Sequence, residues 1–272
     1  MKIVTLMENG SIDSRLKSAH GLCFYIEHEN HKILFDLGPN NDFITNAGIL
    51  GIDLALVDTV IISHGHFDHG RGLKKFMEIN TKAKIYLSKN AFTKQYKKVK
   101  FVYLPIGIKK PKEMDRIVFI EEDTAISDTM KICANVKMTK QIIGDDSLLT
   151  KKNGEYIPDR FDHEIYFYIK TAENIVLLSG CSHKGIENII DRLTKRENII
   201  FSHVIGGFHM SHYDPEDLIQ TTYLESLGQK LKKSQVKKYY SCHCTGDIAY
   251  TALKIQMKEK LERIKTGSVI EL

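Results

Sequence analysis

Residues 57–73 read VDTVIISHGHFDHGRGL, and this stretch decides the fold. Its first part, VDTVIIS, is mostly apolar, which is typical of a strand covered on both faces. Three histidines and one aspartate follow at once, within residues 64–69. Each of these groups is costly to bury unless something binds it. The stretch therefore predicts a strand that ends in a binding site.

The residue types in this cluster are those of a metal site. Neutral imidazole and carboxylate are the usual ligands of Zn²⁺ and other divalent first-row ions. His64 and His66 lie two residues apart on an extended loop, so both can bind one ion. Asp68 and His69 can turn toward a second position, and Gly65 allows the tight turn that this requires. We expect one or two divalent ions, zinc foremost, with manganese, iron and nickel also suited to these ligands.

Histidines also follow other predicted strands of the chain. His183 comes after IVLLSGC, His209 after HVIGGF and His243 after KKYYSC. Loops at one edge of a sheet are where binding sites are built. We therefore predict that His183 and His243 complete the metal ligands. The segment KGIENIIDRLTKR between them carries its isoleucines and leucine at helical spacing, which predicts an amphipathic helix.

Two further patterns in the second half concern helix and strand ends. The segment DPEDLIQ predicts a helix with Asp214 as its N-cap and Pro215 in the first turn. The segment VKKYYSCHC predicts a strand that ends at His243. Side chains alternate along a strand, so Cys242 and Cys244 would point away from His243. We interpret these two cysteines as packing residues.

Composition limits the class of protein. The 272 residues are 42% hydrophobic and 27% charged, with a net charge of +5. No linker-like tract appears, so we expect one domain over 1–272, with a lysine-rich insertion or lid at 82–112. The absence of a long apolar run excludes a membrane partner. Five widely spaced cysteines indicate a reduced, cytoplasmic protein. The mild positive charge favours a small anionic substrate and is too small to predict a nucleic-acid partner.

At this point the motifs resemble a known family. SHGHFDH resembles the His-x-His-x-Asp-His signature of the metallo-β-lactamase superfamily. AHGLCFYIE, SHGHFDHGRGL, SGCSHKGIENI, IGGFHM and CHCTG occur along the chain in an order that resembles one branch of it. That branch is named for 7,8-dihydropterin-6-yl-methyl-4-(β-D-ribofuranosyl)aminobenzene 5′-phosphate synthase. The resemblance implies an α+β fold, a four-layer αβ/βα sandwich with metals at one edge.

The resemblance also implies roles for single residues. It assigns His64 and His66 to a first metal, and Asp68 and His69 to a second. It assigns His243 to the second metal as well. In ILFDLG it implies that Asp36 braces the metal loop.

Two further positions of the family pattern are less clear, and one of them departs from it. His163 falls where members supply a third histidine, and Cys181 falls where they supply a bridging acid. We prefer His183 over His163 as the ligand, because GCSH is the motif that the branch shares. Cys181 has two interpretations, a ligand of the second metal or a small buried hydrophobic residue.

Chemistry can be assigned to three side chains. Metal ions lower the pKa of bound water, and Asp68 could orient that water for attack. His209 could bind a metal, bind an anionic substrate or donate a proton. We prefer the last two roles, since the other ligands suffice without it. His20, in the branch-like AHGLC, is expected to line the substrate pocket.

Three function classes remain open. The first is a metal-dependent hydrolase, or a related enzyme, acting on a small anionic substrate that contains a pterin or a phosphate. The second is a nuclease or phosphodiesterase on the same fold. The third is a metal-binding or metal-sensing protein without turnover. No Gly-x-Ser-x-Gly, P-loop or Gly-x-Gly-x-x-Gly motif occurs, so serine nucleophiles, nucleoside triphosphates and dinucleotides have no support.

Overall fold

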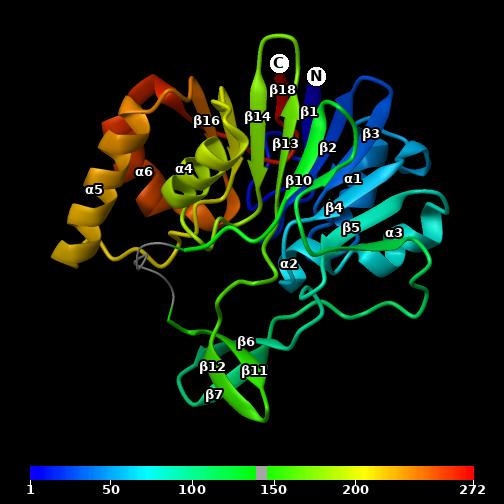
Figure 1. Cartoon of the computed structure of the whole chain (residues 1–272), viewed down its shortest axis with the longest axis horizontal. Helices are drawn as coiled ribbons and strands as arrows, with labels where there is room; N and C mark the ends of the chain where they lie inside the picture. Colours follow the sequence, from blue (N-terminus) through cyan, green and yellow to red (C-terminus); the bar gives the residue numbers. More distant parts are fainter. Residues whose placement is uncertain (139–145) are drawn as a thin grey trace. The chain divides into compact units, whose positions relative to one another are not determined.

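The structure, a computed structural model, describes residues 1–138 and 146–272 (Figure 1). These residues divide into two compact units. The first unit holds 1–122, 146–165 and 265–272, and the second holds 123–138 and 166–264. The sequence predicts one domain, and that remains a prediction.

A mixed seven-stranded sheet forms the centre of the first unit. Its strand order is β18-β1-β2-β3-β4-β5-β8, antiparallel from β18 to β3 and parallel from β3 to β8. The strands are β1 (Lys2–Met7), β2 (Cys23–His28), β3 (His31–Phe35), β4 (Thr59–Ile62), β5 (Lys84–Ser88), β8 (Ile117–Ile120) and β18 (Val269–Glu271). Every residue of β4 is buried, as its unbroken apolar pattern predicts.

Short helices cover one face of this sheet. They are α1 (Asp42–Ile49), η1 (Leu54–Leu56), α2 (Phe67–Gly70) and α3 (Leu73–Ile79). Phe43 of α1 and Phe76 of α3 are fully buried against Val60 and Ile62 of β4 and their neighbours. This packing fixes the end of β4, from which the histidine cluster continues into α2.

A second, four-stranded sheet belongs to the same unit. It contains β6 (Gln95–Val99), β7 (Val102–Pro105), β11 (Leu148–Lys152) and β12 (Glu155–Pro158) in the order β12-β11-β6-β7. The predicted insertion at 82–112 thus begins with a strand of the seven-stranded sheet, β5, and only its later part forms β6 and β7. Its role as a lid stays a prediction.

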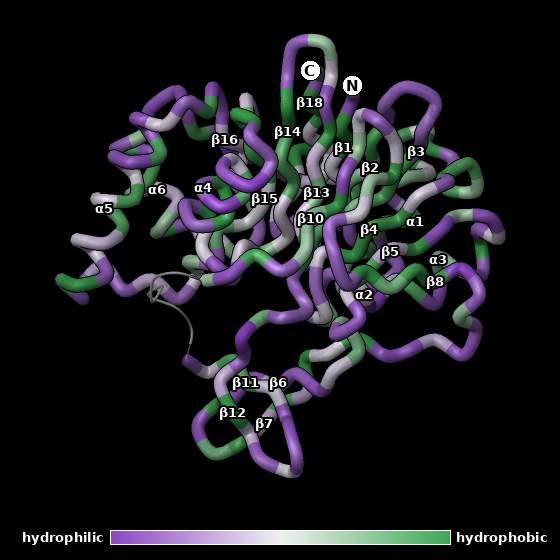
Figure 2. The backbone as a smooth tube through the Cα atoms, in the orientation of Figure 1, coloured by the Kyte–Doolittle hydropathy of each residue, from purple (hydrophilic) through white to green (hydrophobic). Residues whose placement is uncertain are grey.

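The second unit is built on another seven-stranded sheet. The order is β17-β16-β15-β14-β13-β10-β9, and strands β14 to β17 are parallel. The strands are β9 (Thr124–Ala125), β10 (Met130–Cys133), β13 (Tyr166–Lys170), β14 (Ile175–Ser179), β15 (His203–Gly206), β16 (Lys238–Ser241) and β17 (Leu261–Arg263). Apolar residues are concentrated along these strands, and polar residues in the turns between them (Figure 2).

Helices cover a face of this sheet too: α4 (Ile186–Glu197), α5 (Leu218–Lys233) and α6 (Asp247–Met257), with the short turns η2 (His243–Thr245) and η3 (Lys258–Lys260). In α4 the residues at helical spacing are all buried, which agrees with the predicted amphipathic helix. The helix predicted to start after Asp214 begins three residues later. Asp217 is its cap, and its carboxylate accepts hydrogen bonds from the amides of Ile219 and Gln220.

Candidate metal centre

The loop after β4 carries four metal-donor side chains, all in the first unit. His64, His66, Asp68 and His69 are at most 8% exposed. His66 is extended and precedes α2, while Asp68 and His69 lie within that helical turn. A Cβ atom at Gly65 would lie 2.3 Å from the carbonyl oxygen of Ala91, so only glycine fits there. The predicted cluster is thus a buried, tightly turned loop.

Asp36 supports this loop from the end of β3. Its carboxylate accepts hydrogen bonds from the Ser63 amide at 2.7 Å and the Ser63 hydroxyl at 2.8 Å. The same carboxylate lies 2.6 Å from Nδ1 of His69, and both side chains are fully buried. A carboxylate at Nδ1 places the ring proton there, so Nε2 carries the lone pair with which a histidine binds a metal. The geometry agrees with the bracing role that the resemblance implies.

The donor rings are close to one another. The ring centroids of His64 and His66 are 4.7 Å apart, and those of His64 and His69 are 4.2 Å apart. Nε2 of His69 lies 3.7 Å from Oδ2 of Asp68. Burial, together with the nearby His163, lowers the pKa of His66 to about 3. A neutral imidazole is the form that binds metal.

His163 already has a partner at each ring nitrogen. Its Nδ1 accepts a hydrogen bond from the Gly65 amide at 3.0 Å, and its Nε2 lies 3.2 Å from the Asp159 carboxylate. In this arrangement no ring nitrogen of His163 is left for a metal. His163 thus contacts the backbone of the loop, and the preference for His183 as the ligand stays a prediction.

His20 lies beside the loop. Its Nε2 is 3.5 Å from Oδ2 of Asp68, and its side chain is 59% exposed. The close approach depends on Gly21, where a Cβ atom would lie 2.5 Å from the carbonyl oxygen of Asp68. His20 therefore reaches both solvent and a proposed ligand, which fits a residue that lines a pocket.

The second unit has its own donor cluster, at the carboxyl ends of β14, β15 and β16. Donor atoms of Cys181, His183 and His209 lie within 4.8 Å of one another, and so do those of Cys181, His243 and Cys244. Parallel strands end at the same edge of a sheet, so the three strand-end loops meet there. Within this unit, Cys181 is thus grouped with His183 and His209 on the one hand and with His243 on the other.

His209 is the most unusual member of this cluster. Its ring centroid is 4.1 Å from that of His183, and both of its ring nitrogens are buried without a hydrogen-bond partner among residues 1–138 and 146–272. Buried polar atoms nearly always have a partner, so these two nitrogens point to a bound ligand. Within the second unit, the nitrogen and sulfur donors and this imidazole suit a divalent metal.

The strand alternation predicted through Cys244 is wrong, and the interpretation of Cys244 as a packing residue stays a prediction. Strand β16 ends at Ser241, and residues 243–245 form the turn η2, so side chains do not alternate there. Burial alone would raise the pKa of the Cys244 thiol, but Cys181, His209 and His243 hold that pKa well below its usual value. By contrast, burial raises the pKa of Cys133 to about 12. Sequence reasoning missed Cys244 because it assumed that the strand continued.

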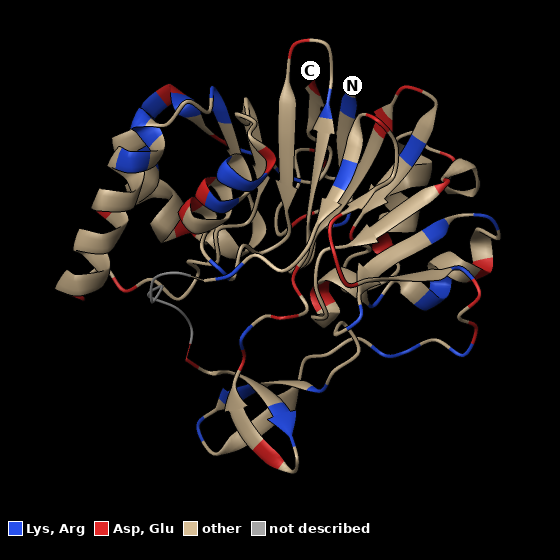
Figure 3. Cartoon of the chain, in the orientation of Figure 1, with Lys and Arg blue, Asp and Glu red and all other residues tan. Residues whose placement is uncertain are grey.

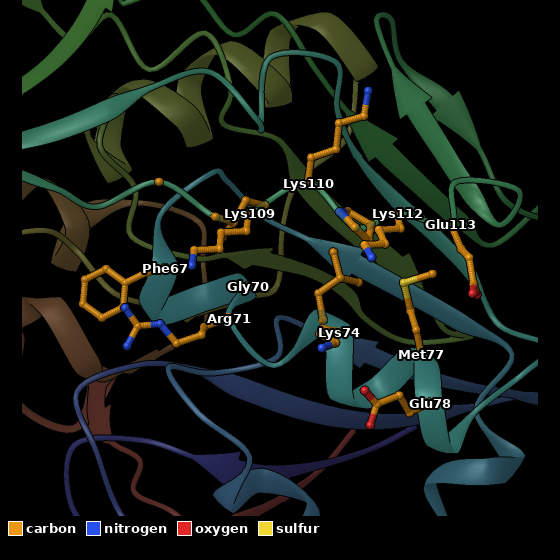
Figure 4. A pocket seen from close by; sticks show the side chains of 14 residues that line it. Phe67, Gly70, Arg71, Lys74, Met77, Glu78, Lys109, Lys110, Lys112 and Glu113 are labelled. Atoms are coloured by element: carbon orange, nitrogen blue, oxygen red, sulfur yellow. The ribbon is translucent and has the colours of Figure 1, made fainter.

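A cavity of about 800 Å³ lies beside α2 and α3 of the first unit (Figure 4). Five basic and two acidic side chains line it, over a floor that includes Leu73, Met77 and Ile108. The basic residues are Arg71, Lys74, Lys109, Lys110 and Lys112, and most of them lie along the segment between β7 and β8 (Figure 3). The acidic Glu78 is paired with Lys75 at 2.9 Å. The cavity suits an anionic molecule with an apolar body.

Comparison with known proteins defines the class. Residues 19–132 match the family model described as the metallo-beta-lactamase superfamily, and a relative at 30% identity spans the whole chain. The chain therefore belongs to the metallo-β-lactamase superfamily, as the motifs indicate.

That relative is the 7,8-dihydropterin-6-methyl-4-(beta-D-ribofuranosyl)-aminobenzene-5′-phosphate synthase of Methanocaldococcus jannaschii; the match covers 100% of this chain and 96% of the relative. The predicted branch is thus confirmed. An uncharacterized protein of the same organism is 27% identical over 92% of this chain and 93% of its own length.

Solved structures confirm the fold. The crystal structure of a metal-dependent hydrolase of the β-lactamase superfamily matches with a TM-score of 0.83 and 27% identity, over 100% of this chain and 99% of that one. Zn²⁺-bound PqqB from Methylobacterium extorquens matches with a TM-score of 0.56 and 10% identity over the full length of both chains, which bears on the fold alone. Among the helices of the described residues, none has the length and apolar character that crossing a membrane requires.

Proposed function

We propose that this protein is a metal-dependent hydrolase, or an enzyme with related chemistry, that acts on a small anionic substrate. The observation that carries the proposal is the buried loop 64–69. It holds four donor side chains, and the Asp36 carboxylate fixes the orientation of one of them. Imidazole and carboxylate groups gathered and buried on one loop are the donor set that divalent first-row ions bind.

The proposed metal ligands are His64, His66, Asp68 and His69 in the first unit and His183 and His243 in the second. A divalent ion bound by such ligands lowers the pKa of a coordinated water and polarises a carbonyl or phosphoryl oxygen. Zinc suits this set of imidazole and carboxylate donors, as do manganese, iron and nickel.

The remaining roles belong to side chains of this chain. The Asp68 carboxylate orients the attacking water and accepts its proton. His209 binds an anionic group of the substrate, or protonates the leaving group, through its two buried ring nitrogens. His20, exposed and 3.5 Å from the Asp68 carboxylate, contacts the substrate.

Two observations support an anionic substrate with a pterin or phosphate group. The cavity beside α2 and α3 combines an apolar floor with five basic side chains. The synthase relative is named for a product that contains a pterin and a phosphate. All five cysteines are free thiols, which supports our further proposal that the protein works in a reducing compartment such as the cytoplasm.

The test is a substrate screen with matched metal states. Phosphodiesters, thioesters, lactones and pterin phosphates are offered to the metal-free chain and to the chain reconstituted with zinc, manganese, iron or nickel. We expect metal-dependent turnover of an anionic small molecule. Equal turnover without metal would contradict the proposal. Cleavage of nucleic acid alone would favour the nuclease alternative, and tight metal binding without any turnover would favour a metal sensor.

A further inference from the structure

The second unit brings together two thiols that the proposed ligand set does not use. Cys181 follows β14, and Cys244 lies in η2; both are at most 4% exposed. Their sulfur atoms and a ring nitrogen of His243 all lie within 4.8 Å of one another. On a tetrahedral zinc ion with Zn–S bonds of about 2.3 Å, two sulfur ligands are about 3.8 Å apart. The observed grouping needs only a small contraction to reach that geometry.

The protein fixes the position of the Cys244 sulfur. The His209 amide donates a hydrogen bond to Sγ of Cys244 at 3.2 Å, and the Cys244 thiol lies 3.5 Å from the carbonyl oxygen of Cys181. A Cβ atom at Gly207 would lie 2.4 Å from the same sulfur, so this glycine leaves room for it. The amide of His209 can keep donating to the sulfur once the thiol has lost its proton, and such a hydrogen bond orients a metal ligand.

The other buried cysteines provide a contrast within the same chain. Cys23 belongs to the hydrophobic cluster of the first unit, and Cys133 to that of the second. They behave as small apolar residues, the usual state of a buried free cysteine. Cys181 and Cys244 lie in neither cluster and are grouped with histidine nitrogens instead. Their surroundings are those of ligands rather than of core residues.

We propose that Cys181 and Cys244, together with His243, bind a divalent ion of the second unit through two sulfur atoms. This inference rests on the proposed function, because it assumes a metal-binding protein. Two thiolates and a neutral imidazole balance the charge of a divalent ion. Sulfur ligands favour zinc, cobalt or iron over manganese and magnesium, so the inference also narrows the choice of metal.

Cobalt is the probe that tests this inference. The full-length chain is stripped of metal and titrated with Co²⁺, and the near-ultraviolet absorption is recorded. Thiolate bound to cobalt gives an intense charge-transfer band that imidazole and carboxylate do not give. We expect the band in the native chain, a weaker band in Cys181→Ser and in Cys244→Ser, and none in the double variant. Cys242→Ser is the matched control, because Cys242 is equally buried and two residues from Cys244; it should keep the full band.

The outcomes separate the two proposals. Stoichiometric cobalt binding without the charge-transfer band would overturn the sulfur ligands and leave the metal enzyme intact. Absence of cobalt binding by the native chain would overturn both. Loss of the band in Cys242→Ser, but not in Cys244→Ser, would show that the wrong cysteine is assigned. If a variant does not fold, X-ray absorption at the zinc edge of the native chain decides, since two sulfur neighbours at about 2.3 Å are expected.

Discussion

Asp36→Asn is the substitution that tests the bracing of the metal loop most directly. The Asp36 backbone has a φ of +64°, a conformation that asparagine tolerates as well as aspartate, so the change adds no backbone strain. The shape of the side chain is also kept. What changes is the atom that faces Nδ1 of His69: an amide NH₂ there donates a hydrogen bond instead of accepting one.

The expected magnitude follows from the three hydrogen bonds of this carboxylate. The amide oxygen can still accept from Ser63, but His69 must move its proton to Nε2 to accept from the new amide. Nε2 then has no lone pair for the ion. Loss of such a supporting contact typically lowers metal affinity about 10- to 100-fold. A disturbed buried hydrogen bond also lowers the free energy of unfolding by roughly 1–3 kcal/mol.

Asp58 provides a matched control. It lies 3.1 Å from Nδ1 of His31 and accepts hydrogen bonds from the Lys32 amide and the Thr59 hydroxyl, the same three kinds of group that surround Asp36. The Asp58 side chain is 35% exposed and serves no proposed ligand. Asp58→Asn should therefore leave metal affinity unchanged.

The assay is competition with a metal chelator, with thermal unfolding of the metal-free variants measured in parallel. Asp36→Asn with native metal affinity and a folded structure would refute the bracing argument. Equal losses of affinity in both variants would also refute it, because the effect would then not be specific to the metal loop.

Four other outcomes are expected. His66→Ala should lose most of the bound metal, as measured by elemental analysis after reconstitution; a fully loaded variant would mean that this histidine is not a ligand. Asp68→Asn should fold normally and lose turnover by about 10²- to 10⁴-fold, because an amide cannot accept the proton of the attacking water; near-native turnover would place the catalytic centre elsewhere. His209→Ala should keep its metal content and lose about 10²-fold in kcat/KM, whereas loss of metal at matched stability would make it a ligand. Arg71→Glu should raise KM for the anionic substrate far more than it lowers kcat, and the difference in KM between the variant and the native chain should shrink at high salt. An unchanged KM would exclude the cavity as the binding site of the substrate.

The metal loop could be predicted from the sequence because its donors are contiguous. Residues 64–69 follow an apolar strand directly, so the residue types and the strand end are visible in one window of sequence. The buried face of α4 was predictable for a similar reason, since helical spacing is a local property. Both predictions rest on patterns shorter than about 20 residues.

The cysteine pair could not be predicted in the same way. Cys181 and Cys244 are 63 positions apart, and their proximity depends on the parallel pairing of β14, β15 and β16. The turn η2 also interrupts the alternation that a continued strand would have had. The role of His163 was hidden as well. One of its nitrogens contacts the Gly65 amide, which is distant in the sequence, and the other contacts the nearby Asp159 carboxylate. Side-chain donors identify candidates, but only tertiary structure shows which nitrogens remain free.

Three residues of the centre have a left-handed backbone conformation, which several ordinary turn residues share. Asn198 has a left-handed φ at the end of α4, where asparagine is a common choice and glycine would serve as well. Asp36, His209 and His243 have φ values of +64°, +50° and +50°, where each non-glycine residue costs roughly 1–2 kcal/mol. Glycine would relieve that cost but would remove the carboxylate or the imidazole. A left-handed φ alone does not identify a functional residue, because Glu29, Lys100 and Lys258 have it too; at Asp36, His209 and His243 it coincides with a side chain that the metal centre is proposed to use.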